Sequence, residues 1–113
     1  MYRLEMTDDL GRILSYPLKE QGAVSVGRQE SNDIVLLDKS VSRQHCIFHV
    51  DGDSVAIEDS ASVNGVLVGG QRISTRTPLH RGDEIIIGEY RFFLRVGGNV
   101  DDDTKQTFVG NLP

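Results

Sequence analysis

The chain has 113 residues, a net charge of −5 and a single cysteine, Cys46. That length fits one domain and leaves little room for a catalytic core beside a separate binding module. The acidic balance argues against a general nucleic-acid binder, because such proteins neutralise many phosphates with Lys and Arg. A lone cysteine excludes an internal disulfide and a multi-cysteine zinc site, and it favours a reducing compartment, so a cytoplasmic protein is expected. No stretch of sequence approaches the roughly 20 apolar residues that span a bilayer, so no membrane segment is expected.

Short runs of alternating apolar and polar residues recur between turn signals, which is typical of an all-β sandwich or barrel. Residues 2–6 and 13–16 alternate in this way on either side of Asp and Gly residues, which predicts a first hairpin that ends at Pro17. Aromatic residues make up only 6% of the chain and Trp is absent, so Val, Ile and Leu should fill the core. Further strands are expected at residues 24–26, 33–36, 45–50, 55–57, 66–68, 85–87 and 91–96.

Residues 97–113 differ in character from the rest of the chain. They are polar, contain an acidic run at residues 101–103, and offer no alternating partner run. This composition predicts a domain over residues 1–96, followed by a flexible acidic tail or linker. Thr104 and Thr107 in this segment are candidate phosphorylation sites.

Three short motifs lie in predicted loops that border strands. They are Gly27-Arg28, Ser42-x-x-His45 and Asn64-Gly65. In order and spacing they resemble the motif of the forkhead-associated (FHA) domain family, and residues 79–88 resemble the penultimate strand of that family. The resemblance covers roughly residues 2–96. It implies an antiparallel β-sandwich of about ten to eleven short strands, with ligand loops at one end, that binds phosphothreonine peptides.

The resemblance implies that Arg28 and Ser42 bind the phosphate. An Arg guanidinium presents a planar fork of donors to phosphate oxygens, and a Ser adds its hydroxyl and backbone amide. The alternative interpretations are a surface arginine in a turn and a hydroxyl that caps its own loop. Val63 departs from the family pattern, which commonly has a hydroxyl or a basic residue at this position. One phosphate donor is therefore missing, which predicts weaker phosphate binding or compensation by other charges.

Arg43 and Asn64 are expected, by the same resemblance, to contact the peptide. The side-chain amide of Asn64 supplies both a donor and an acceptor to a peptide backbone, although a plain Asn-Gly turn is the alternative. Lys39 and Arg43 would supply compensating charge. Ser62 is a further candidate for peptide contact if its loop turns the hydroxyl toward the ligand.

Three residues of the motifs are expected to be structural. By the resemblance, His45 forms hydrogen bonds between loops and does not touch the ligand. Gly27 and Gly65 serve backbone geometry, through a positive φ or a close approach.

Catalysis is not expected. Ser42, His45 and several Asp residues provide the residue types of a Ser-His-Asp hydrolase triad, but no nucleophile-elbow motif surrounds the serine. His45 and His49 share a strand face by spacing, yet no third ligand is evident, so neither a metal nor another cofactor is expected.

Two functions remain open from the sequence. The first is a phosphothreonine-binding signalling module whose partner is a protein phosphorylated by an upstream Ser/Thr kinase. The second is a phosphate-independent interaction or assembly module that uses another face of the sandwich. A phosphate on Thr104 or Thr107 would make the chain's own tail a ligand at high effective concentration. Arg72 and Arg76 would favour an acidic residue in the peptide.

Overall fold

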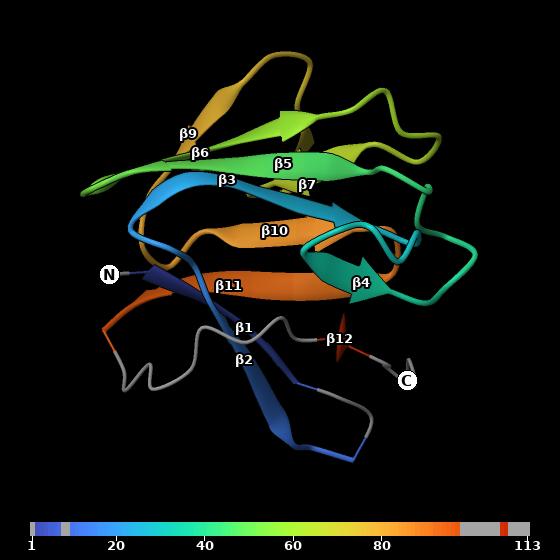
Figure 1. Ribbon diagram of the computed structural model, residues 1–113, viewed down its shortest axis with the longest axis horizontal. Helices are drawn as coiled ribbons and strands as arrows, with labels where there is room; N and C mark the ends of the chain where they lie inside the picture. The colour runs from blue at the N-terminus through green and yellow to red at the C-terminus, as the bar shows by residue number, and fades with distance from the viewer. Residues whose placement is uncertain (1, 8–9, 98–106, 109–113) are drawn as a thin grey trace.

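The computed structural model describes residues 2–7, 10–97 and 107–108. These residues form strands and turns and contain no helix, as the alternating pattern predicts. Consequently no helix in this part of the chain is long and apolar enough to cross a membrane. The strands make two six-stranded sheets that pack face to face (Figure 1).

The first sheet has the strand order β2-β1-β11-β10-β7-β8, and every neighbouring pair in it is antiparallel. The predicted first hairpin is confirmed, since β1 and β2 pair from Arg3 opposite Pro17 to Thr7 opposite Ile13. Pro17 is the last residue of β2. A proline can occupy this position because β2 is an edge strand of the sheet, where a missing N–H donor need not break a ladder hydrogen bond. The strands are β1 (Tyr2–Thr7), β2 (Ile13–Pro17), β7 (Val66–Val68), β8 (Gln71–Arg72), β10 (Glu84–Ile87) and β11 (Tyr90–Val96).

The second sheet has the order β12-β4-β3-β5-β6-β9. Strands β3 and β4 are parallel, with Val26 opposite Ile34, because residues 28–33 cross over instead of turning back as a hairpin. The sequence resemblance had implied a wholly antiparallel sandwich, and the parallel pairing of β3 with β4 corrects that detail. The strands are β3 (Gln21–Gly27), β4 (Ile34–Leu36), β5 (Cys46–Asp51), β6 (Ser54–Asp59), β9 (Thr77–Leu79) and β12 (Thr107–Phe108).

The last strand, β12, belongs to the segment that the sequence predicts to be a tail. It runs parallel to β4, with Thr107 opposite Val35 and Phe108 opposite Leu36. The remainder of that segment, including Thr104, lies outside the described residues, so the domain boundary stays a prediction. Eleven strands precede β12. Of these, β8 and β9 were not expected from the sequence, because β8 has only two residues and Pro78 lies in the middle of β9.

Burial alternates along the strands and places one core between the sheets. In β5, Cys46, Phe48 and Val50 are buried, whereas Ile47 and His49 are partly exposed. Each buried aliphatic or Phe side chain stabilises the fold by about 1.5–3 kcal/mol relative to exposure. Burial also raises the pKa of the Cys46 thiol, which is therefore neutral at physiological pH.

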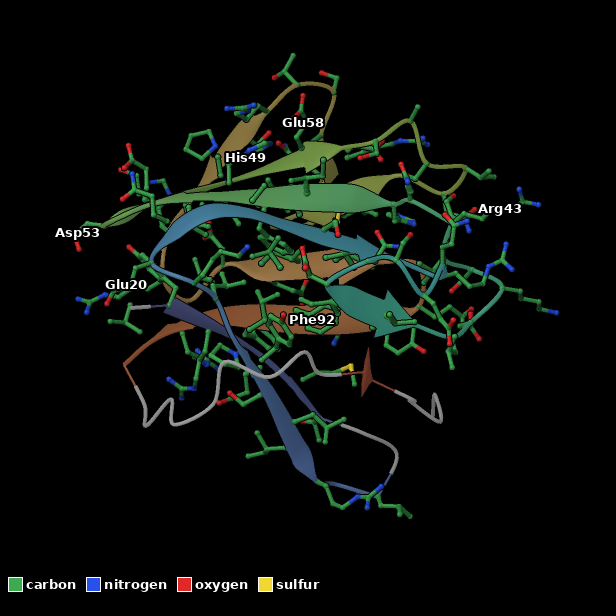
Figure 2. The ribbon with its side chains drawn as sticks, viewed as in Figure 1. Glu20, Arg43, His49, Asp53, Glu58 and Phe92 are labelled. Carbon is green, nitrogen blue, oxygen red and sulfur yellow. The ribbon has the colours of Figure 1, made fainter. Side chains whose placement is uncertain are left out.

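The sandwich brings the connections that follow β3, β4 and β6 to the same end. Figure 2 shows Arg43 at this end of the molecule, opposite Glu20 and Asp53. Phe92 lies between these ends, within the body of the sandwich, and is 1% exposed. The packed sheets thus serve as a rigid base for the loops that carry the sequence motifs.

Candidate functional site

An open cleft of about 440 Å³ lies at the loop end of the sandwich. Three connections form it: residues 28–33 after β3, 37–45 after β4, and 60–65 after β6. It brings together five of the residues predicted to bind phosphate or peptide. These are Arg28, Lys39, Ser42, Arg43 and Asn64.

Arg28 is held at its base and free at its tip. Its backbone N–H donates to the Ser42 carbonyl at 3.0 Å, and its Nε donates to the Val41 carbonyl at 3.1 Å. The side chain is exposed. Because a backbone carbonyl occupies only Nε, both Nη groups remain available to an anion.

Ser42 is connected to both neighbouring loops. Its backbone N–H donates to His45 Nδ1 at 3.0 Å, and its Oγ accepts the Val63 N–H at 3.0 Å. A hydroxyl that accepts one bond keeps its own proton for another. Ser42 can therefore donate this proton to a ligand in the cleft. The Val63 side chain beside it is 83% exposed.

His45 is completely buried and forms hydrogen bonds on every polar group. Its Nδ1 accepts from Ser42, so the ring proton sits on Nε2, which donates to the Gly65 carbonyl at 2.8 Å. Its backbone N–H donates to the Val26 carbonyl at 2.8 Å, and its carbonyl accepts the Ser60 N–H at 2.9 Å. This neutral imidazole joins two of the cleft loops, which fits the structural role that the sequence suggests.

Asn64 bridges to the loop that follows β4. Its Nδ2 donates to the Ser40 carbonyl at 2.8 Å, which leaves Oδ1 to accept a peptide N–H. The Ser40 hydroxyl in turn donates to Asp38 Oδ2 at 2.5 Å and accepts the Glu89 N–H at 3.0 Å. Hydrogen bonds from the hydroxyl and the N–H of Ser40 lower the pKa of Asp38, so this carboxylate is ionised at neutral pH. Sequence reasoning missed Ser40 because only the fold reveals its partners.

Gly27 is required by a close approach of the loops. A Cβ at this position would lie 2.7 Å from Asn32 Nδ2 and against the Arg43 carbonyl. Asn32 is only 3% exposed and donates from Nδ2 to the carbonyls of Gln29 and Arg43, both at 2.8 Å. Asn32 was not predicted as a site residue. The sequence shows only that it is a polar residue between two strands, which does not reveal its buried hydrogen bonds.

Ser62 does not line the cleft. It is 8% exposed, and its hydroxyl donates to Asp59 Oδ1 at 2.6 Å while accepting the Gly65 N–H at 3.0 Å. Both capacities of the hydroxyl are thus used inside the loop. The residue suggested as a peptide contact is instead a buried cap, and it supports Gly65, whose φ of 77° is in the left-handed region.

The FHA domain family matches residues 24–88 of the chain. The chain belongs to the FHA domain family. Among curated proteins, this FHA domain is similar to the glycogen accumulation regulator GarA of Mycolicibacterium smegmatis, with 35% identity over 85 residues that cover 75% of the chain and 53% of GarA. It is also similar to the transcriptional regulatory protein EmbR of Mycobacterium tuberculosis, with 34% identity over 96 residues that cover 85% of the chain and 24% of EmbR. The chain therefore spans about half of GarA and a smaller share of EmbR.

Solved structures of FHA domains share the fold. The FHA domain of CT664 from Chlamydia trachomatis superposes with a TM-score of 0.81 and 30% identity, covering 86% of this chain and 98% of that one. Mycobacterium tuberculosis EmbR, solved in complex with a low-affinity phosphopeptide, gives a TM-score of 0.73 and 34% identity, covering 88% of this chain and 26% of that one.

The cleft of this FHA domain is cationic although the chain is acidic. Arg28, Lys39 and Arg43 line it, and no carboxylate of the described residues does. The ion pairs of the described residues involve none of these three cations. Unpaired cations at the end of rigid loops attract an anion, because no internal bond has to be broken first. Within the described ranges, no three His, Cys, Asp or Glu side chains converge as a metal site would require.

Proposed function

We propose that this FHA domain binds a threonine-phosphorylated segment of a partner protein and so mediates phosphorylation-dependent protein association. The observation that carries the proposal is the pair formed by Arg28 and Ser42, which keep free Nη groups and a free hydroxyl proton in one cleft. The phosphopeptide complex of the similar EmbR structure supports the same chemistry.

Each side chain has a distinct part in the proposed complex. Arg28 and Ser42 donate to the phosphate, and each charge-assisted hydrogen bond contributes roughly 1.5–3 kcal/mol. Lys39 and Arg43 add positive potential, and Asn64 Oδ1 accepts a backbone N–H of the peptide. His45, Ser62, Gly27 and Gly65 hold the loops in place.

The proposal makes the domain a binding module and not a catalyst, acting after an upstream Ser/Thr kinase. The similar proteins GarA and EmbR are named as regulators, which supports this role. The single buried thiol of Cys46 suits a reducing compartment, so we include a cytoplasmic location in the proposal.

A peptide titration tests the proposal. Degenerate phosphothreonine peptides are compared with phosphoserine and unphosphorylated versions, on the wild-type domain and on Arg28→Ala. We expect the phosphothreonine set alone to bind well, and Arg28→Ala to weaken it on the order of 10- to 100-fold. Arg81→Ala is the matched control, because Arg81 is an exposed arginine outside the cleft. Equal binding of all three peptide sets would instead favour the phosphate-independent interaction module.

The chain's own tail is a second proposed source of the phosphothreonine. The pairing of β12 with β4 supports this source, because β4 leads directly into the cleft loop at residues 37–45. We propose that a phosphate on Thr104 or Thr107 enters the cleft of the same or of a neighbouring molecule. Amide resonances of Arg28, Ser42 and Asn64 should then shift on phosphorylation, independently of protein concentration if binding is internal. Unmoved resonances would exclude the tail as a ligand.

A further inference from the structure

Arg72 lies against the backbone of the phosphate cleft. At Gly65, a Cβ would sit 2.7 Å from Arg72 Cζ and 3.1 Å from its Cδ, so the guanidinium covers this glycine. The next residue toward the cleft is Asn64, which lines it. The β7–β8 hairpin pairs Arg72 with Leu67 and thereby fixes the base of the side chain.

The charge of Arg72 is not neutralised. Its side chain is exposed and has neither an ion pair nor a hydrogen bond within the described part of the chain. Other arginines do have carboxylate partners, at N–O distances between 3.2 and 3.5 Å. These paired arginines are Arg3, Arg76, Arg91 and Arg95.

We propose that Arg72 forms a second anionic subsite beside the phosphate cleft, and that the preferred ligand carries another negatively charged side chain near its phosphothreonine. The inference rests on the proposed phosphopeptide function and names the class of peptide. Packing against Gly65 restricts the side chain, so less conformational entropy is lost when it pairs with a ligand. The subsite adjoins Asn64, because Arg72 covers the next residue, Gly65.

Arg76 does not belong to this subsite, although it follows Arg72 closely in the sequence. Its Nη2 lies 3.5 Å from Glu58 Oε1, and the same carboxylate oxygen is 2.9 Å from His49 Nε2. Arg76 lines a separate depression on the outer face of β5 and β6, where Figure 2 shows His49 and Glu58. Arg76 is therefore a matched control of equal charge and similar exposure.

The test uses one phosphothreonine peptide with Ala at the flanking positions, into which a single Asp is introduced at each position in turn. We expect one position at which Asp tightens wild-type binding by about two- to fivefold, the range of an exposed ion pair. This advantage should disappear in Arg72→Gln and persist in Arg76→Gln. In Arg72→Glu, Lys at the same position should bind better than Asp.

The two sources of negative charge are separated by replacing that Asp with phosphoserine. An Arg72-dependent advantage of either group supports the subsite, and the larger advantage identifies the natural group. An Asp scan with no preferred position, or an equal loss in Arg72→Gln and Arg76→Gln, would overturn the inference. The all-Ala phosphopeptide should bind wild type and Arg76→Gln equally, because Arg76 lies outside the proposed site. Its failure to bind the wild-type domain would contradict the proposed function instead.

Discussion

The loop end of the domain and the outer face of β5 and β6 arrange their charges in opposite ways. At the loop end, the Val41 carbonyl holds Arg28 through Nε, and within the described part of the chain no carboxylate lines the cleft. On the outer face, Glu58 pairs with both His49 and Arg76 (Figure 2). Backbone groups orient a cation without neutralising it, whereas a carboxylate does both. The charge at the loop end therefore remains available to a ligand.

Size alone would not distinguish the two regions. The depression on the outer face measures about 520 Å³ and the loop-end cleft about 440 Å³. The outer depression is lined by small side chains such as Ala23, Ala56 and Pro78, and its basic residues, His49 and Arg76, both pair with Glu58. In the smaller cleft, the hydrogen-bond donors of Arg28 and Ser42 point to one place, and hydrogen bonds between the loops fix the positions of these residues. Donor geometry and unpaired charge, more than volume, mark the candidate site.

The largest expected contrast is between His45, in the connection that leads into β5, and His49, within β5. His45→Ala should lower the free energy of unfolding by about 2–5 kcal/mol, because it leaves the Ser42 N–H and the Gly65 carbonyl without partners. His49→Ala removes only a partly exposed pair and should cost less than about 1 kcal/mol. Urea unfolding measures both values. Similar losses in the two variants would mean that the loop end is not the more tightly constrained region.

Two serines separate binding from support within the loop end. Ser42→Ala should weaken phosphopeptide binding by roughly 10- to 100-fold with little change in stability, because it removes a proposed phosphate donor. Ser62→Ala should mainly lower stability, by about 1–3 kcal/mol, since Asp59 and the Gly65 N–H lose their partner. Calorimetric titration and urea unfolding on both variants check this. A reversed pattern would assign the phosphate contact to Ser62.

Val63 tests whether the cleft lacks one donor. Val63→Thr preserves the β-branched shape at a position that is 83% exposed, so stability should hardly change. The added hydroxyl should tighten phosphopeptide binding by about two- to tenfold, which corresponds to one net hydrogen bond of about 0.5–1.5 kcal/mol. Val63→Ala should not tighten binding and is the control for shape. An unchanged affinity in Val63→Thr would place the phosphate away from this residue.

The smallest expected effect concerns two carboxylates, one in each region. The pKa of Asp38 is lowered by hydrogen bonds from Ser40, and that of Glu58 chiefly by the hydrogen bond from His49. A lowered folded-state pKa contributes stability above the ordinary value, about 3.9 for Asp and 4.3 for Glu, and this contribution is lost as pH falls through the folded value. Asp38→Asn and Glu58→Gln should each flatten the acid limb of the stability curve. Carboxyl NMR titrations that show ordinary pKa values would contradict this.

Much of the fold was predictable because a strand has a period of two residues. The alternation around Phe48 and around Phe92 identified β5 and β11. The parallel pairing of β3 and β4 was not predictable. Nothing in residues 28–33 shows that they cross over, because the direction of a connection depends on where the chain can pack.

The sequence by itself determined the all-β class and placed Arg28, Ser42 and Asn64 in loops that belong to one motif. Only the tertiary structure decided what each loop residue can do. Ser62 was a candidate contact until its hydroxyl was found bonded to Asp59 and Gly65. Arg72 and Arg76 looked equivalent until one was found against Gly65 and the other beside Glu58. The reason is physical: a local pattern records propensity and burial, whereas hydrogen-bond partners and unpaired charge depend on residues distant in the chain.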